Sequence, residues 1–518
     1  MIIYKILLPD ILVSELMLNF RNRYKMKKIG ILYSLVVLAV LWGCQDLTEL
    51  NDNPNNVSET HPQLLLTNIA SSAFQVQGTG ALYATRMLVQ TDGENNNQYY
   101  NWNRASFDDY NMLGEVTKMM QEAERIGSDE YVALSKFFRA YYFYNLTLTF
   151  GDIPYSEALN GETEEKYLPK YDTQKEVFMG ILQELSEAND LLEGNTNIIA
   201  GDVIYGGNTV KWQKLINSFR LKILMTLSKK ESDADLNIIS TFANIYNNEP
   251  IMESNEDNGQ LVFLDEEGSR YSEFNSSSYG SGMYVSATFI ERLQDREDPR
   301  LFIYCGQTKN AKEAGLAIDD FSAYEGGDPI APYAEVNDKA AAGDVSKVNL
   351  RYTTDPTNEP HNLMGYWELE FILAEAAVRG WISSDAMVHY ENGVKASFSF
   401  YNDYAKNFEV YVEASDAETY LAGPLVAFDN SLPTAEKLEL ILTQKYLTSF
   451  LQTGWRAYFD HLRTGYPAFV QLPDATPPTR WIYPNSEYEN NTANVAAAIE
   501  SQFGTGNDKI REITWWLQ

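Results

Sequence analysis

Apolar residues recur at every third or fourth position along most of the chain, which is the spacing of an amphipathic helix. The clearest start is a capping box, in which Thr173 is followed three positions later by Glu176, and apolar residues then keep helical spacing to Leu192. Segments with the same spacing are 64–74, 107–125, 130–150, 208–229, 234–246, 363–380, 384–401, 434–451 and 491–501. The sequence therefore predicts a mainly α-helical protein.

The predicted helices can be grouped into consecutive pairs. Four pairs are expected, at 107–150, 173–230, 363–401 and 434–463. Units of two antiparallel helices with a period of about 34 residues are typical of TPR repeats. Because the spacing here is irregular, we expect a TPR-like helical repeat scaffold of about four helix pairs and not a regular array.

A long segment, 248–362, interrupts the helical pattern. It is rich in Gly, Ser, Asn, Pro and Tyr, and only 286–294 within it is expected to be helical. Loops that a rigid scaffold positions are where binding residues most often lie. We therefore expect 248–362 to be a large loop-rich insertion that carries the ligand-binding region.

An apolar run from Ile29 to Trp42 follows Lys27 and Lys28 near the start of the chain. A helix of that length is too short to cross the ~30 Å hydrocarbon core, so the run fits the apolar part of a signal peptide. The residues from 41 to 44 resemble a bacterial lipobox, and this resemblance implies cleavage before Cys44 and acylation of that cysteine. We expect residues 1–43 to be a signal peptide, with the lipoprotein signal at 26–43. Translation is then expected to start at Met26, so that residues 1–25 result from a mis-called start codon.

Residues 44–62 follow the proposed lipidation site and are rich in Asn, Asp and Pro. Such a segment predicts a flexible tether, and about 15 residues of it would allow a mean excursion of ~20 Å. Residues 63–518 are expected to form a single domain.

The chain carries a formal net charge of −32, and loss of residues 1–43, with six basic and two acidic residues, would lower it to −36. Phosphates would be repelled, so no nucleic acid is expected as a partner, and attachment to a membrane must come from the lipid on Cys44. The other cysteine, Cys305, would then have no partner for an intrachain disulfide.

Motifs of catalysis or metal binding are not found in the sequence. The four histidines, His61, His361, His389 and His461, have no zinc-ligand spacing, and neither a phosphate-binding loop nor a nucleophile elbow occurs. No metal, cofactor or catalytic residue is therefore expected. With 72 acidic residues, chance carboxylate pairs are inevitable, so a lipid-anchored glycoside hydrolase remains an alternative.

Aromatic residues gather among amides and charged groups in two loop regions. A sugar ring offers an apolar face of C–H groups and a fringe of hydroxyls, which aromatic rings and polar side chains can bind. The alternative is that these rings seal the insertion onto the helices. The candidate ligand-binding residues are Tyr99, Tyr100, Trp102, Arg104, Tyr271, Phe274, Tyr279, Tyr284 and Tyr324.

An ordered set of segments resembles the SusD/RagB family of nutrient-binding outer-membrane lipoproteins of Bacteroidetes-type bacteria, nearest its SusD-like branch. Each segment alone is weak, but their order behind a lipobox is specific. The segments are NDNPNN (51–56), 138–159, 169–182, 201–224, DPRL (298–301), 367–380, 444–467 and 480–491. The departure from the family pattern at 455–463 does not affect the expected fold.

This resemblance implies a TPR-like cell-surface lipoprotein that is not an enzyme. It would bind nutrient oligosaccharides and deliver them to a SusC-like TonB-dependent outer-membrane transporter. Peptide or glycopeptide capture is the alternative within the family. A pure assembly protein without a ligand of its own is a further possibility. The candidate binding residues above rest on their chemistry and not on the resemblance.

Overall fold

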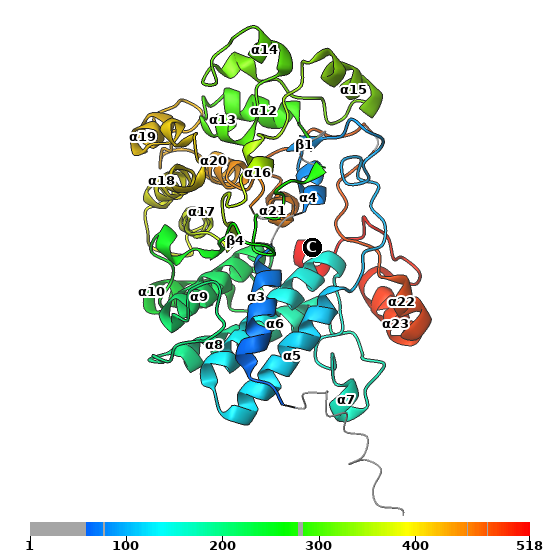
Figure 1. Ribbon diagram of the computed structural model, residues 1–518. Coiled ribbons are helices and arrows are strands. Elements are labelled where there is room, and N and C mark those ends of the chain that lie inside the picture. The colour runs from blue at the N-terminus through cyan, green and yellow to red at the C-terminus, as the bar shows by residue number, and fades with distance from the viewer. Residues whose placement is uncertain (1–58, 76–77, 278–282, 453, 474) are drawn as a thin grey trace, which may run out of the picture. The chain divides into compact units, whose positions relative to one another are not determined.

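Helices make up most of the structure, as the apolar spacing predicts (Figure 1). The computed structural model describes residues 59–75, 78–277, 283–452, 454–473 and 475–518, and residues His61–Gln518 form one compact unit. The predicted signal peptide, Cys44 and nearly all of the predicted tether lie outside the described residues. The helix α3 begins at Pro62, so the last residue of the predicted 44–62 tether belongs to a helix.

Except for the short helix α4, which lies higher in the view, the first group of helices forms the lower part of the unit in Figure 1. Neighbours in sequence pack together, with α5 on α6, α6 on α8, and α8 on α9. The capping box of Thr173 and Glu176 is present at the start of α8. The helices are α3 (Pro62–Phe74), α4 (Thr79–Ala84), α5 (Asp109–Ile126), α6 (Asp129–Phe150), α7 (Gly161–Glu164), α8 (Gln174–Leu192), α9 (Thr209–Thr226) and α10 (Ile238–Asn248).

The start of α10 differs from the prediction of 234. Residues 234–236 form a turn, and Asn237 adopts a left-handed conformation with φ of 48° directly before the helix. A left-handed residue cannot continue a right-handed helix, so α10 begins only at Ile238.

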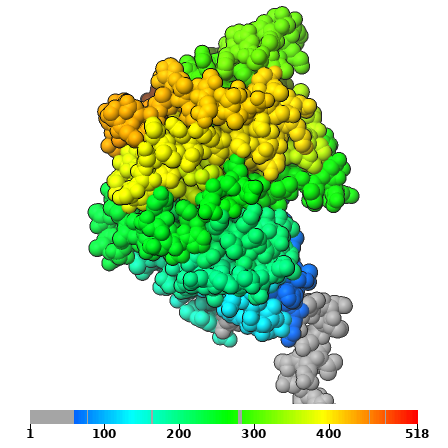
Figure 2. All heavy atoms as spheres, turned by 90° about the vertical axis from the view of Figure 1, so that its left-hand side faces the viewer, coloured from blue at the N-terminus to red at the C-terminus, as the bar shows by residue number. Residues whose placement is uncertain are grey.

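The second group of helices packs around α17 (Tyr366–Val378). This helix contacts α18 and α20 of its own group and α9 of the first group, so it joins the two groups. On the face shown in Figure 2, the second group, yellow to orange, lies between the teal first group and the light-green insertion. The other helices of this group are α18 (Ala386–Tyr404), α19 (Ala414–Leu421), α20 (Thr434–Leu447) and α21 (Arg456–Thr464). The last two helices, α22 (Asn485–Asn490) and α23 (Thr492–Phe503), pack on each other, and Gln502 of α23 accepts from the Asp152 amide, just after α6, at 2.8 Å.

The insertion contains more helix than predicted. The expected helix is present as α12, but the expectation that it is the only one was wrong, since α15 spans ten residues between Pro332 and Gly343. Of these ten residues only Val336 is buried, so apolar spacing could not reveal the helix. The helices are α12 (Ala287–Gln294), α13 (Arg300–Tyr304), α14 (Lys309–Glu313), α15 (Tyr333–Ala342) and α16 (Arg351–Thr354).

Two short antiparallel strand pairs attach the insertion to the helices. The strand β1 (Leu88–Val89) pairs with β3 (Tyr284–Val285), and β2 (Gly259–Leu261) pairs with β4 (His361–Met364). The predicted helix start at 363 was therefore wrong. Residues 361–364 pair as a strand, and the helix begins only after the extended Gly365.

Aromatic rings fill the core between α3, α6 and α9. The Trp212 ring of α9 meets Phe74 at a centroid distance of 6.1 Å, Phe137 at 5.6 Å and Phe138 at 5.8 Å, in edge-to-face contacts. No helix among the described residues is both long enough and apolar enough to cross a membrane.

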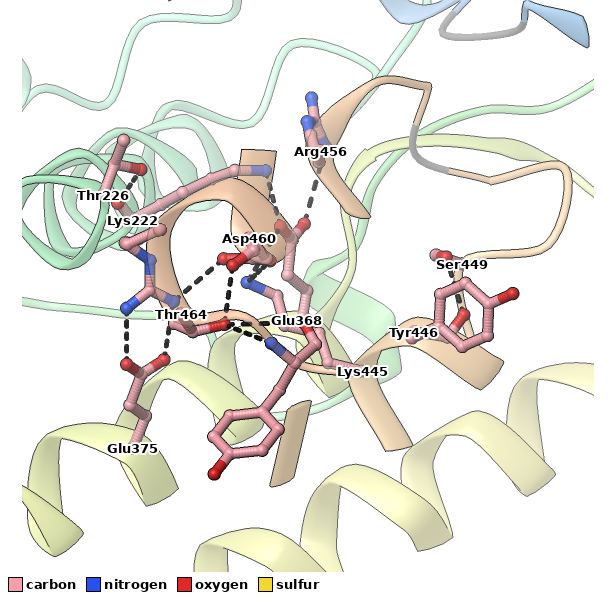
Figure 3. A network of polar contacts seen from close by, with 12 residues as sticks. Lys222, Thr226, Glu368, Glu375, Lys445, Tyr446, Ser449, Arg456, Asp460 and Thr464 are labelled. Carbon is pink, nitrogen blue, oxygen red and sulfur yellow. Dashed lines mark hydrogen bonds and ion pairs between the residues drawn. The ribbon is translucent and has the colours of Figure 1, made fainter. Parts of the chain in front are cut away.

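A buried set of ion pairs, here called the Glu368 network, joins α9, α17, α20 and α21 (Figure 3). Its members are Lys222, Glu368, Glu375, Lys445, Arg456, Asp460 and Arg463. Lys222 Nζ lies 2.6 Å from a Glu368 oxygen, and Lys445 Nζ lies 2.8 Å from Asp460. Burial alone would raise the pKa of Asp460, but Lys445 and Arg463 lower it to about 2.

Replacing Glu368 by Gln should strongly destabilise the fold. The change leaves Lys222, Lys445 and Arg456 near a neutral amide in a buried site, where breaking an ion pair costs about 3–5 kcal/mol. Urea unfolding should show this loss in the free energy of unfolding.

The matched control is Glu313→Gln. Glu313 pairs with Lys309 across 3.9 Å at the surface, so its loss should change stability by less than about 1 kcal/mol. Equal losses for Glu368→Gln and Glu313→Gln would contradict a supporting role for the network.

Candidate functional site

A cavity of about 560 Å³ lies in the insertion between α13, α14 and the segment 343–350. Its volume is within the range of ligand sites, about 300–1,000 Å³. We call it the α14 cavity. It is lined by Tyr284, Phe302, Cys305, Gly306, Gln307, Lys309, Lys312, Ile318, Tyr324, Ala340, Gly343, Val345, Lys347, Val348, Asn349, Leu350 and Phe408.

Aromatic rings form much of the cavity wall. The rings of Phe302 and Tyr324 lie 5.7 Å apart, and the Tyr324 hydroxyl donates to the Ile318 carbonyl at 2.7 Å. Tyr284 of β3 is half-buried, and Lys347 Nζ lies 5.2 Å from the centre of its ring. Of these, Tyr284 retains exposed ring surface, whereas Tyr324 is buried in the wall.

The polar residues of the wall divide into two kinds. The amides are engaged by the backbone, since Asn349 donates to the Phe302 carbonyl at 3.0 Å and Gln307 donates to the Leu316 carbonyl at 2.9 Å. The charged residues are lysines. Gln307 and Asn349 therefore shape the cavity, while the ammonium groups of Lys309 and Lys312 are the strongest donors that it offers a ligand.

Buried ion pairs fix the helix that supplies the inner wall. Arg300 of α13 is fully buried against Asp298, with Nη2 and Oδ2 2.6 Å apart. The same guanidinium donates to Ser397 of α18 at 3.1 Å and to Gln444 of α20 at 3.0 Å. This ties α13, and with it Phe302, to the helical scaffold.

Cys305 lies in the wall but gives no sign of thiol chemistry. It is a free, buried cysteine, and burial raises the pKa of its thiol. A protonated thiol is a poor nucleophile and a poor metal ligand.

The structure brings two of the predicted site residues, Tyr284 and Tyr324, to this cavity. Three others point into the protein interior. Tyr100 is buried and its hydroxyl donates to the Ala84 carbonyl at 3.1 Å, and Tyr271 packs edge-on against Phe263 with ring centres 5.2 Å apart. Trp102 is only 6% exposed and stacks on Trp481, with ring centres 3.9 Å apart.

This interior position leaves Tyr100, Trp102 and Tyr271 with almost no exposed side-chain surface, and their role in ligand binding stays a prediction. A ring with almost no exposed surface has no face to offer a sugar, so in this structure these residues pack the loops onto the helices. The same holds for most of the Tyr324 ring. The sequence could not separate the two outcomes, because a ring in a loop has the same neighbours in sequence whether it faces inward or outward.

The other predicted residues lie outside the cavity wall. The Tyr99 hydroxyl donates to the Ala331 carbonyl at 2.9 Å, and Arg104 donates to the Tyr483 carbonyl at 2.5 Å. Phe274 is half-buried beside Arg270. Tyr279 lies outside the described residues.

The cavity lysines Lys309, Lys312 and Lys347 were not predicted. The predicted residues lie in stretches rich in aromatic rings, whereas none of these lysines has an aromatic residue next to it in the sequence. A usable signal was the spacing of Lys309 and Lys312, which places two cations on one short helix in a strongly acidic chain.

The histidines all make structural contacts. His61 caps α3, His389 Nδ1 lies 2.7 Å from Glu370, and His461 Nδ1 lies 2.9 Å from the Pro467 carbonyl. Burial lowers the pKa of His361 to about 3. Within the described part of the chain, no cluster of His, Cys, Asp or Glu could hold a metal ion.

The arrangement of helices and insertion corresponds to a known class of protein. The chain belongs to the SusD-like family, whose sequence profile, described as starch-binding and associating with the outer membrane, matches residues 54–484. The resemblance seen in the sequence is thereby confirmed, and so is the mainly helical, TPR-like fold. No curated protein matches the chain.

Solved structures support this assignment. An outer membrane protein from Bacteroides vulgatus, to which a role in nutrient binding has been attributed, is 51% identical over 89% of this chain and 100% of its own, with a TM-score of 0.86. A SusD homologue from Bacteroides fragilis is 52% identical over the same shares, with a TM-score of 0.85. A chitin-binding protein is 25% identical over 88% of this chain and 99% of its own, with a TM-score of 0.69.

Trp102→Ala should damage the fold and leave ligand affinity unchanged. Removing a buried Trp side chain costs about 3–5 kcal/mol, and urea unfolding should show that loss. Tyr167, which is 75% exposed, gives the control, since Tyr167→Ala should change stability by less than about 0.5 kcal/mol. A Trp102→Ala protein of normal stability and weakened ligand binding would instead place this ring in a ligand site.

Proposed function

We propose that this protein is a non-catalytic lipoprotein of the cell surface that binds nutrient oligosaccharides in the α14 cavity. It delivers them to a SusC-like TonB-dependent transporter in the outer membrane. The observation that carries the proposal is a ligand-sized cavity with aromatic and amine-bearing walls on a SusD-like scaffold. The transporter partner follows from membership of the family.

The chemistry of the wall supports a sugar ligand. Tyr284 and Phe408 can meet the C–H face of a sugar ring, and the lysine ammonium groups can donate to hydroxyl oxygens. The family description of starch binding and the chitin-binding relative agree with a carbohydrate ligand. Peptide or glycopeptide capture remains the second candidate.

The lack of carboxyl groups in the described cavity lining argues against the hydrolase alternative. Glycoside hydrolysis needs a pair of carboxyl groups flanking the bond that is cleaved. None of the described residues that line the cavity is an Asp or Glu. Burial raises the pKa of Asp109 to about 6 and that of Asp152 to about 7, but neither residue lines the cavity.

Attachment to the membrane rests on the lipobox-like sequence that ends at Cys44. Two or more acyl chains give stable anchoring, and the polar residues 44–62 would leave the bound protein room to move over the transporter. In this scheme the signal peptide 1–43 is removed, and 63–518 forms the binding domain.

Palmitate labelling of cells that express the protein tests the anchor. The wild-type chain should incorporate label and fractionate with the outer membrane, and Cys44→Ser should lose both properties because the thiol is the acylated atom. Cys305→Ser is the matched control and should keep the label, since its thiol is buried. Label that persists in Cys44→Ser would contradict acylation at this residue.

Calorimetric titration of the Cys44→Ser chain with panels of oligosaccharides and peptides tests the ligand class. We expect binding of an oligosaccharide, and Tyr284→Ala should weaken it about tenfold through loss of ring stacking. Tyr167→Ala, at an exposed ring outside the cavity, should bind normally.

Three outcomes of this titration would contradict the proposal. Heat only with peptides would favour the peptide alternative. Heat with no probe would favour a pure assembly protein. Release of new reducing ends from the oligosaccharides would indicate a hydrolase.

A further inference from the structure

The charged residues that line the α14 cavity are positive, whereas the chain as a whole is strongly negative. The protein has 72 acidic and 40 basic residues, yet the described lining includes Lys309, Lys312 and Lys347 and no acid. A surface patch drawn at random from this chain would be mainly acidic. The local excess of positive charge therefore calls for a specific explanation.

The backbone holds these three lysines around one space. Lys309 and Lys312 stand on α14, whose first turn is capped by the Thr308 hydroxyl, which accepts from the Ala311 amide at 3.1 Å. Lys347 stands on a bridge to Tyr284, and its carbonyl accepts from the Gly306 amide at 2.8 Å. Two separate segments thus bring their amines to the same cavity.

Carboxylates of the protein neutralise the charges of Lys309 and Lys312 only weakly. Lys309 is 3.9 Å from Glu313, and both side chains are largely exposed, so the pair contributes little. Lys312 makes no ion pair with any residue that the structure describes. The Asp344 carboxylate, near in sequence to the cavity wall, accepts from Asn310 at 2.7 Å.

Two lysines outside the cavity, Lys175 and Lys214, are held differently. Lys175 lies 2.6 Å from Asp235 and 2.9 Å from Asp233, and Lys214 lies 2.9 Å from Asp257. Such close contacts satisfy the ammonium group internally. In contrast, the two α14 lysines keep donors available for a ligand.

We propose that the oligosaccharide bound in the α14 cavity is acidic and carries carboxylate or sulfate groups. This inference rests on the proposed function and adds the class of sugar. The ammonium groups of Lys309, Lys312 and Lys347 pair with the anionic groups, while Tyr284 contacts the ring. A lysine is a point charge on a flexible stem, so it can pair with anionic groups at several positions along a glycan.

The acidity of the whole chain does not prevent this binding. At physiological ionic strength charges are screened over about 8 Å, so distant carboxylates act weakly on a bound anion. Lysines in direct contact act at hydrogen-bond distance, where charge-assisted bonds are strong. Binding should weaken as salt increases, because these contacts are only partly buried.

Titration of the Cys44→Ser chain with matched glycan pairs tests the proposal. For the carboxylate arm the probes are hexagalacturonate and its methyl ester, and for the sulfate arm a chondroitin sulfate hexasaccharide and its desulfated form. Maltohexaose and chitohexaose are the neutral probes. At least one acidic probe should bind about tenfold more tightly than its neutral or desulfated partner.

Variants locate the effect in the cavity. The triple change Lys309→Gln, Lys312→Gln and Lys347→Gln should remove the preference for the acidic probe, and the corresponding Lys→Arg triple should keep it. Lys118→Gln, Lys175→Gln and Lys395→Gln together change the net charge equally at lysines outside the cavity. This control triple should bind the acidic probe as the wild type does. Circular dichroism should confirm that all three triple variants are folded.

The failure of this inference differs from failure of the proposed function. One outcome is that maltohexaose or chitohexaose binds as tightly as every acidic probe, and that Tyr284→Ala weakens this binding while the lysine triple does not. That outcome would overturn the acidic class and leave sugar binding intact. An acidic probe that binds the lysine triple unchanged would also overturn it. Binding of none of the sugars, neutral or acidic, would overturn the proposed function itself.

Discussion

The carboxylate of Glu368 holds together helices that are far apart in the sequence. It is buried on α17 and lies 2.6 Å from Lys222 of α9, 3.5 Å from Arg456 of α21 and 3.9 Å from Lys445 of α20. Removing a carboxylate from water costs several kcal/mol unless cations replace the lost hydration. The network therefore favours the one packing in which α9, α20 and α21 all reach α17 (Figure 3).

The insertion depends on that scaffold through a second set of buried charges. Arg300 binds Asp298 and reaches α18 and α20, and the Arg351 guanidinium pairs with Glu359, which accepts from Gln452 at 2.7 Å. These contacts fix both ends of the α14 cavity wall. A wall that is already ordered loses little entropy when a ligand binds, which suits the binding role proposed for this protein.

The sequence was informative about the scaffold and much less so about the site. Helix α8 buries a continuous apolar stripe behind a capping box, so its spacing and its start stand out in the sequence. Helix α15 has one buried residue and β4 is fully buried, so neither shows the expected periodicity. The site depends on which loop rings face inward, as Trp102 does. It also depends on the fold that brings Lys347 to the same cavity as Lys309 and Lys312 of α14. Those are properties of tertiary packing, which local sequence does not encode.

A crystal structure of the protein grown with a bound oligosaccharide tests the central claim most directly. The account predicts that a sugar ring lies against Tyr284 and that an anionic group of the same glycan lies within hydrogen-bond distance of Lys309, Lys312 or Lys347. A glycan bound elsewhere on the protein, with the α14 cavity filled only by solvent, would contradict the account.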